Sequence, residues 1–280
     1  LLPYVLGIIN FIGYPSYLDG EVRKKVSLKQ VFSHLASVAK DAVKSSRLRQ
    51  LFVESIAFEG TYKVAKDYLQ PIVKYAALSL PLLGMMGKLQ KTAALILVVY
   101  VLLHLLEGMA SRRSEYLRLR AGGEEAGARV LWWTNLAVFI VIAAGLGSGV
   151  FLAAGDASWG IAMAIIGFVA LAVVQNLWRP LQVGRYNTAT GAAVGATVLS
   201  IESQLKSITA AILAPLIGLA VDALRTSHET ITVGASFVPV ALFGIIISLV
   251  VIVLTKPMAE PVDVCSTDTD ETGKVIDEDL

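Results

Sequence analysis

The stretch Gln50–Gln70, QLFVESIAFEGTYKVAKDYLQ, decides how this chain folds, because it combines helical spacing with charges that lipid does not tolerate. Glu59, Lys63 and Asp67 follow one another at intervals of four residues, so they share one face of a helix. A charged side chain at the centre of a lipid-exposed helix costs about 2.5–3.5 kcal/mol on insertion scales. If this helix crosses a membrane, its charged face must line protein or a watery cavity.

The composition around this stretch is that of a membrane protein. The 280 residues are 55% hydrophobic and 16% charged, against about 25% charged residues in a soluble domain, and the mean hydropathy is +0.67. Five later segments have the roughly 20 apolar residues needed to cross a bilayer. They are Leu89–Ala110, Val130–Gly155, Ala157–Trp178, Ala196–Val221 and Thr230–Thr255. The sequence therefore predicts an all-α, polytopic membrane protein.

Two basic segments determine the number of crossings. Glu21–Arg49 carries eight Lys and Arg residues and Ser111–Arg129 carries five, so the positive-inside rule places both in the cytoplasm. An even number of crossings must separate two cytoplasmic segments, and Leu89–Ala110 supplies one. We therefore expect Gln50–Gln70 to supply the other, which gives a six-helix transmembrane bundle over residues 50–255.

The segment that follows is the competitor for this crossing. We expect Pro71 to end the helix, because proline removes a backbone donor and clashes with the preceding turn. Ile72–Met86 is apolar, but it has only 15 residues and contains Lys74 and Pro81. We expect it to be an external loop that packs on the membrane surface. If it crossed instead, the charges of Gln50–Gln70 would lie outside the membrane.

The ends of the chain are predicted from composition. Leu1–Leu18 is apolar and kinked by prolines and glycines, so we expect the final part of a span, and the absence of an initiator Met suggests missing preceding sequence. Residues 19–49 form a basic cytoplasmic loop with an amphipathic helix at Ser27–Ser45, which is either a latch between two halves of a transporter or a surface linker. Lys256–Leu280 carries eight acidic and two basic residues and is predicted to be a disordered cytoplasmic tail.

Charged residues near the middle of the predicted spans are the candidate substrate or ion pathway. Glu59 lies about 15 Å along its helix from Arg49, and Lys206 lies about 15 Å from Ala196, at 1.5 Å per residue. Secondary transporters bind substrates and coupling ions at such midplane sites. Opposite charges four residues apart have a second reading, in which they only neutralise one another and hold helices together. The candidate pathway residues are Glu59, Lys63, Glu202, Lys206, Gln175 and Asn176.

Enzyme signatures are missing from the sequence. It has no HExxH, no GxSxG and no Walker-type phosphate loop, so we expect no catalysis, no cofactor and no metal. His104 and Glu107, three residues apart, suit a proton relay. They lie near the cytoplasmic end of Leu89–Ala110, however, where a simple pairing of the two side chains is the simpler interpretation. G-L-G-S-G at Gly145–Gly149 is interpreted as helix packing. The net charge of +2 gives no indication of nucleic-acid binding, and the single cysteine, Cys265, allows no internal disulfide.

Three motifs carry a family resemblance. They are FEGTYKVAKDYLQP at Phe58–Pro71, SRRSEY at Ser111–Tyr116 and ATVLSIESQLKSITAAILAPLIGLAVD at Ala196–Asp222. With them the chain resembles the C-terminal half of a major facilitator superfamily (MFS) transporter, from the sixth helix to the twelfth. The resemblance implies a central cavity bordered by the seventh, eighth, tenth and eleventh helices. Structural or conformational roles are expected for Asp67, Pro71, Arg112, Arg113 and Asp222.

The resemblance implies alternating access between two six-helix halves, of which the N-terminal half is missing from this sequence. We expect a secondary active transporter of a small-molecule solute, possible coupling to protons through buried carboxylates, and a place in the lipid bilayer of a bacterial inner (plasma) membrane with the C-terminus in the cytoplasm. The alternative is a receptor or sensor on the same fold that moves no solute. Flux measurements separate the two.

Overall fold

A computed structural model describes residues 40, 44–79, 87–151, 157–190, 192–227 and 234–255 of the chain. Within these ranges every regular element is a helix and there is no strand, which confirms the all-α prediction. The predicted span end at Leu1–Leu18 and the acidic tail at Lys256–Leu280 lie outside the described residues, as does most of the amphipathic helix predicted at Ser27–Ser45.

The described helices alternate with short connections. In chain order they are α3 (Ser46–Asp67), α4 (Leu69–Ser79), α5 (Lys88–Ala121), α6 (Glu124–Phe151), α7 (Ala157–Thr190), α8 (Ala192–Ser227), the 3-10 helix η3 (Ala235–Phe237) and α9 (Val238–Leu254). Ser45 caps the start of α3, where its Oγ accepts a hydrogen bond from the backbone N–H of Leu48 at 3.4 Å. α5 ends at Gly122, whose φ of 89° is a left-handed conformation that favours glycine.

Five helical segments, one for each of the later predicted spans, are long and apolar enough to cross a membrane. They comprise α5, most of α6, α7 and α8, and η3 together with α9. Half of the residues in the most apolar windows of α6 and α7 are buried, against 17% in those of α5 and α8. α6 and α7 are therefore the centre of the bundle, and α5 and α8 present apolar faces outward.

Two helices extend well beyond the apolar segments that the sequence predicts as spans, Leu89–Ala110 and Ala157–Trp178. α5 continues to Ala121 and α6 begins at Glu124, so only Gly122 and Gly123 separate them. α7 likewise continues past Trp178 to Thr190. The predictions ended these helices where the apolar residues end. A helix needs apolar residues only where it meets lipid or the core, and Arg, Glu and Leu favour the helical conformation in water as well.

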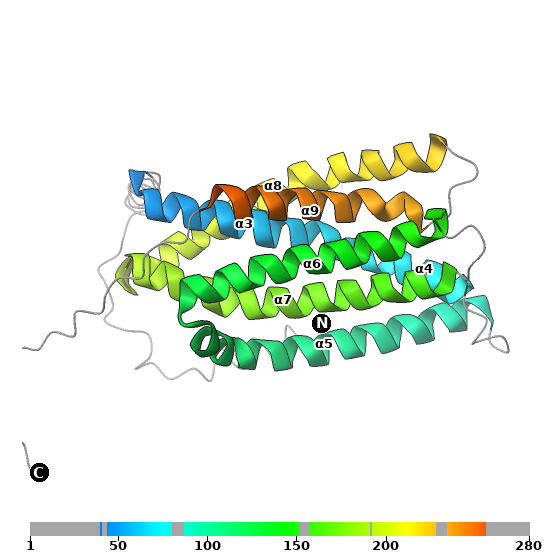
Figure 1. Ribbon diagram of the computed structural model, residues 1–280, viewed down its shortest axis with the longest axis horizontal. Coiled ribbons are helices and arrows are strands. Elements are labelled where there is room, and N and C mark those ends of the chain that lie inside the picture. Colours follow the sequence, from blue (N-terminus) through cyan, green and yellow to red (C-terminus); the bar gives the residue numbers. More distant parts are fainter. Residues whose placement is uncertain are drawn as a thin grey trace, which may run out of the picture.

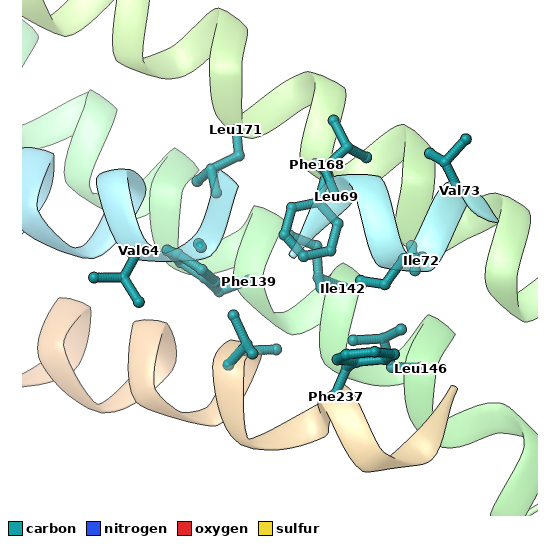
Figure 2. Close-up of a cluster of buried hydrophobic side chains, with 14 of the residues drawn as sticks. Val64, Leu69, Ile72, Val73, Phe139, Ile142, Leu146, Phe168, Leu171 and Phe237 are labelled. Atoms are coloured by element: carbon teal, nitrogen blue, oxygen red, sulfur yellow. The ribbon is translucent and has the colours of Figure 1, made fainter. Parts of the chain in front are cut away.

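The prediction for the segment after Pro71 is wrong. The helix breaks at Tyr68, and α4 then continues through Pro71, which lies in the first turn of α4. α4 is not an external surface loop, because Ile72, Val73 and Ala76 are buried in the main hydrophobic core. In that core they join Phe139 and residues of α6, α7 and η3 (Figure 2). Leu69, Ile72, Val73, Ala76 and Ala77 follow the helical spacing of one buried face.

Successive helices run in opposite directions along the bundle (Figure 1). α3 and α4 follow one another from one end of the bundle to the other, and α5 returns. The beginning of α3, the end of α5, the end of α7 and the end of α9 consequently lie at the same end. α3 and α4 together with Tyr68 cover residues 46–79, a stretch about as long as α5, with 34 residues, or α8, with 36.

Close packing of α6 on α7 requires glycine at two positions. A Cβ atom on Gly145 would lie 2.6 Å from the carbonyl oxygen of Gly160 and 2.8 Å from the backbone nitrogen of Ala164. A Cβ on Gly160 would in turn meet Ser148 and the carbonyl oxygen of Gly145. The interpretation of G-L-G-S-G as a helix-packing motif is thereby confirmed for Gly145.

Candidate functional site

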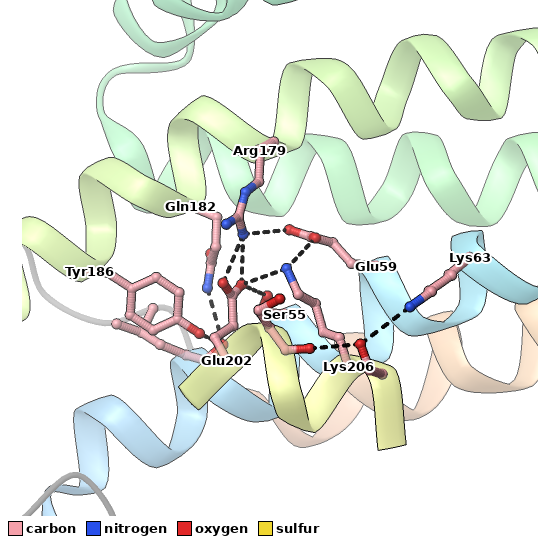
Figure 3. Close-up of polar contacts among 11 residues, drawn as sticks. Ser55, Glu59, Lys63, Arg179, Gln182, Tyr186, Glu202 and Lys206 are labelled. Atoms are coloured by element: carbon pink, nitrogen blue, oxygen red, sulfur yellow. Dashed lines mark hydrogen bonds and ion pairs between the residues drawn. The ribbon is translucent and has the colours of Figure 1, made fainter. Parts of the chain in front are cut away.

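Four charged side chains from three helices form one ionic network (Figure 3). The guanidinium of Arg179, on α7, donates to Glu59 of α3 at 3.0 Å and to both carboxylate oxygens of Glu202 of α8 at 2.8 Å. The ammonium of Lys206 lies 2.5 Å from Glu59 and 3.3 Å from Glu202. Each carboxylate therefore contacts both cations, and α3, α7 and α8 are held together by a network with no net charge.

The members of this network, hereafter the four-residue network, differ in exposure. The Glu202 side chain is fully buried, and those of Glu59 and Lys206 are each 11% exposed. Arg179 is 37% exposed and is the member most open to the surroundings. The hydroxyl of Ser55, one turn before Glu59, donates a further hydrogen bond to Glu202. Removing any one member would leave an uncompensated charge in a buried place.

A second network, whose side chains are more completely buried, surrounds Arg185. Its guanidinium lies 2.7 Å from Glu54 of α3 and makes a two-point contact with Glu125 of α6, at 2.6 and 3.1 Å. The side chains of Arg185, Glu54 and Glu125 are 2%, 4% and 8% exposed. The same guanidinium donates to the side-chain oxygen of Gln182 at 2.8 Å. This Arg185 network connects α3, α6 and α7 near the end of the bundle where α3 begins.

Aromatic and amide side chains add further contacts between α3, α6 and α7. The ring of Phe58 stacks on Trp178 with centroids 4.2 Å apart, and Trp132 meets Phe58 edge-on at 4.9 Å. Gln182 and Tyr186 both donate to the backbone carbonyl of Leu51, at 3.0 and 3.2 Å. That carbonyl belongs to α3, so hydrogen bonds connect α7 to α3 in addition to the ionic networks.

The structure brings together three of the predicted pathway residues and separates the others. Glu59, Glu202 and Lys206 are members of the four-residue network, and the predicted pair of Glu202 with Lys206 is present. Lys63 is exposed, and its ammonium donates to the hydroxyl of Ser207 on α8 at 3.3 Å. Within the described ranges it makes no ion pair with Glu59 or Asp67, although both share its helix face, and Glu59 is engaged by Arg179 and Lys206.

Gln175 and Asn176 do not contact the four-residue network. The side-chain amide of Asn176 donates to the carbonyl of Ala172, one turn earlier in α7, at 2.9 Å. The side-chain oxygen of Gln175 is buried and has no hydrogen-bond partner among the described residues. Neither amide is therefore placed to share a ligand with Glu59 and Lys206 in this conformation.

The predicted structural residues are scattered over the bundle. Arg112 and Arg113 are exposed on the part of α5 beyond the predicted span, and Arg113 borders an apolar groove with Leu106 and Met109. Asp222 is exposed near the end of α8. Pro71 lies in the first turn of α4. Asp67, the last residue of α3, lines a cavity between α3, α4 and α5.

That cavity has a volume of about 540 Å³, and the predicted pair of His104 and Glu107 lies on its wall. The imidazole Nδ1 of His104 is 3.0 Å from the Glu107 carboxylate, which also accepts from Tyr62 at 3.4 Å. The sequence analysis placed this pair near the cytoplasmic end of a span. In the structure α5 runs from Lys88 to Ala121, so the pair lies near its middle. Among the described residues, no group of three His, Cys, Asp or Glu side chains is placed to hold a metal ion.

Two of the three cations in these networks, Arg179 and Arg185, were not predicted as site residues. Both lie beyond the predicted span Ala157–Trp178, but α7 continues past that span and contains them. A signal was present, because five positions recur at helical intervals beyond the apolar segment and all are buried. They are Trp178, Leu181, Gln182, Arg185 and Tyr186. Comparisons with protein-family models, curated proteins and solved structures give no match.

Proposed function

We propose that this chain is the C-terminal half of a secondary active transporter that moves a small solute across a membrane by alternating access. One observation carries the proposal: the four-residue network joins three helices through four charges, of which three are fully or nearly buried. Charged groups inside a membrane are expensive, and they are found mainly in substrate pathways, ion pathways and relays. The resemblance to the MFS family adds a second half that would complete the pathway.

The depth of the network supports this reading. Glu59 lies about 20 Å along the helix from Ser46, Glu202 about 15 Å from Ala192 and Arg179 about 17 Å from Thr190, at 1.5 Å per residue. All three distances start from the same end of the bundle. A hydrocarbon core of roughly 30 Å centred on helices about 50 Å long would therefore enclose the network. Buried carboxylates at this depth are available for proton coupling.

The distribution of basic residues supports an orientation. Arg47 and Arg49 lie in the first turn of α3, and Arg118 and Arg120 lie in the last turn of α5. These turns are at the same end of the bundle, which by the positive-inside rule is the cytoplasmic end. In this arrangement α3 and α4 together cross the membrane once, which brings the number of crossings in the bundle to six. The chain would leave α9 towards a cytoplasmic C-terminus.

Flux through the full-length protein in proteoliposomes tests the proposal. A thermal-shift screen against sugars, drugs, peptides, amino acids and organic anions first identifies a solute that raises the melting temperature. The variant Glu59→Gln leaves two cations facing one carboxylate, and we expect it to cost about 3–5 kcal/mol of stability. The double variant Glu59→Gln with Lys206→Met keeps the network neutral, so we expect it to fold better than the single variant.

We expect both variants to reduce flux by about tenfold or more, because the double variant restores neutrality without restoring the pathway. The matched control is Glu115→Gln with Arg118→Met, which removes an exposed pair at the end of α5 and should leave flux unchanged. Flux at the wild-type level in a folded double variant would show that the network only holds helices together. Solute binding without any flux would instead support the receptor or sensor alternative.

A further inference from the structure

The cavity between α3, α4 and α5 is separate from the four-residue network. Its volume of about 540 Å³ is within the range of small-molecule sites, which is about 300–1,000 Å³. It is lined by Tyr62, Lys66, Asp67, Leu69, Gln70, Tyr100, Leu103, His104 and Glu107. The lining thus combines aromatic, apolar and charged groups, which is the composition expected of a ligand site.

Lys66 and Asp67 are the two charges on the cavity wall that stay outside the ion pairs of the described residues. Within the described part of the chain, the side chains of Lys66 and Asp67 make neither an ion pair nor a hydrogen bond, and both are exposed. Glu107 differs, because His104 and Tyr62 already contact its carboxylate. The wall consequently offers one free cation and one free anion on consecutive residues.

The depth of these charges excludes lipid as their neighbour. Lys66 and Asp67 lie about 20 and 18 Å along the chain of helices from Ser79, and His104 lies about 24 Å from Lys88, which begins at the same end of the bundle. The cavity is therefore near the middle of helices about 50 Å long. Unpaired charges at that depth must face water, protein or a ligand of matching charge.

The helix break at Tyr68 lies against the same cavity. Asp67 ends α3 and Leu69 begins α4, and both residues line the cavity. Pro71 has no backbone N–H, so the carbonyl of Asp67 lacks the donor that a continuous helix would supply four residues later. Interrupted helices place backbone polar groups beside substrates in membrane transporters. The end of α3 and the beginning of α4 thus both lie at the wall that holds these two charges.

The geometry points to this cavity as the binding site for a small organic zwitterion, a molecule with one ammonium and one carboxylate group. Asp67 would receive the ammonium and Lys66 the carboxylate, while Tyr62, Tyr100 and Leu103 would cover an apolar or aromatic body. A plain cation would be repelled by Lys66 and a plain anion by Asp67, so the pair selects a ligand that carries both charges. This inference rests on the proposed transport function, because it names the substrate class.

Three probes with one shared body test the charge requirement on the purified full-length protein. L-phenylalanine carries both groups, phenethylamine carries only the ammonium, and 3-phenylpropanoate carries only the carboxylate. Binding is measured by calorimetry and by thermal shift. We expect L-phenylalanine to bind about tenfold or more tightly than either single-charge probe, since each loses one charge-assisted contact. Equal affinity for a single-charge probe, or no binding of L-phenylalanine at millimolar concentration, overturns the inference.

Variants at the two free charges assign the binding to this cavity. Asp67→Asn and Lys66→Met are exposed substitutions that should fold normally, and each should weaken L-phenylalanine binding about tenfold or more. The matched controls are Glu115→Gln at the end of α5 and Lys74→Met on the exposed face of α4. L-phenylalanine binding that is insensitive to both cavity variants also overturns the inference.

The binding experiment tests the zwitterion site and the flux experiment tests transport, so either proposal can be overturned without the other. L-phenylalanine binding that depends on Lys66 and Asp67, in a protein that moves no solute, would support the site and overturn the transport proposal. Flux of another solute in a protein that does not bind L-phenylalanine would do the reverse.

Discussion

At Arg185, one guanidinium serves two buried carboxylates, and this ratio makes the partners unequal. If Arg185 is removed, Glu54 and Glu125 are left without the cation that both contact. If Glu125 is neutralised instead, Arg185 keeps its contact of 2.7 Å with Glu54. The cation of this network is therefore much harder to replace than the second carboxylate.

We expect Arg185→Met to cost about 3–5 kcal/mol of stability, because it leaves two charged carboxylates buried without a partner. Glu125→Gln should cost about 1–2 kcal/mol, since it removes only one charge-assisted contact. Arg185→Lys should fall between them, because an ammonium cannot reproduce the two-point contact with Glu125. Melting temperatures of the purified variants in detergent test this order. An Arg185→Met protein as stable as Glu125→Gln would contradict it.

Single residues were predictable from the sequence only where local spacing decides their contacts. The pairs Glu202–Lys206 and His104–Glu107 lie one helical turn apart, and both are formed. The partners of Glu59 come from α7 and α8, more than a hundred residues away in sequence, and helical spacing carries no information about them. Glu59 and Lys63 are four residues apart, and this spacing alone predicts that they pair. In the structure Glu59 pairs instead with Arg179 and Lys206, which are distant in sequence.

Glycine at the contact of α6 with α7 provides a test at the level of the element. An added methyl at Gly145 would meet the backbone of Gly160 and Ala164, which cannot move aside as a flexible side chain can. We expect Gly145→Ala to separate the two helices and to cost about 1–3 kcal/mol. Thermal unfolding of the variant in detergent measures this cost.

The control for this substitution is Gly108→Ala on the exposed side of α5, where an added methyl would meet nothing within 4 Å. Gly108→Ala should be neutral or stabilising by about 0.5–1 kcal/mol, because alanine loses less conformational freedom in a helix. If both alanine variants raised the melting temperature alike, the close approach of α6 and α7 would not limit stability.

The helices themselves were predictable where apolar residues mark them, and their ends were not. Pro71 is predicted to end a helix, because proline lacks the backbone N–H that a helix interior needs. Proline is equally suited to the first turn of a new helix, where the missing N–H has no partner to lose. α4 uses Pro71 in that second way, and the break moves to Tyr68. The buried spacing of Ile72, Val73 and Ala76 was the signal for a packed helix.

For the whole molecule, the alternation of basic and apolar segments predicted five later spans, and five segments of the described chain fit. The proposed crossing by α3 and α4 is harder to recognise. Its apolar face points into the bundle, and its buried charges Glu54 and Glu59 meet cations of α7 and α8, so the mean hydropathy of the segment conceals a buried helix. Neither α3 nor α4 alone is both long and apolar enough to be a membrane span. Whether the two cross together depends on which sides of the membrane their ends occupy.

Three cysteine variants, each replacing an exposed base in a Cys265→Ser background, test this crossing. Arg49→Cys lies in the first turn of α3, Lys88→Cys begins α5 and Arg120→Cys ends α5. If α3 and α4 cross the membrane together, Arg49→Cys and Arg120→Cys are on the same side. Only Lys88→Cys should then react with a membrane-impermeant maleimide in intact cells, and all three should react after permeabilisation.

The pattern separates the two possible topologies, because α5 is common to both. If Arg49→Cys reacted from outside together with Lys88→Cys, α3 and α4 would return to the side on which they start. The four-residue network would then lie outside the hydrocarbon core, where paired charges cost little and need no functional explanation. The four-residue network supports transport only if α3 and α4 cross the membrane. The reactivity of Arg49→Cys decides whether they do.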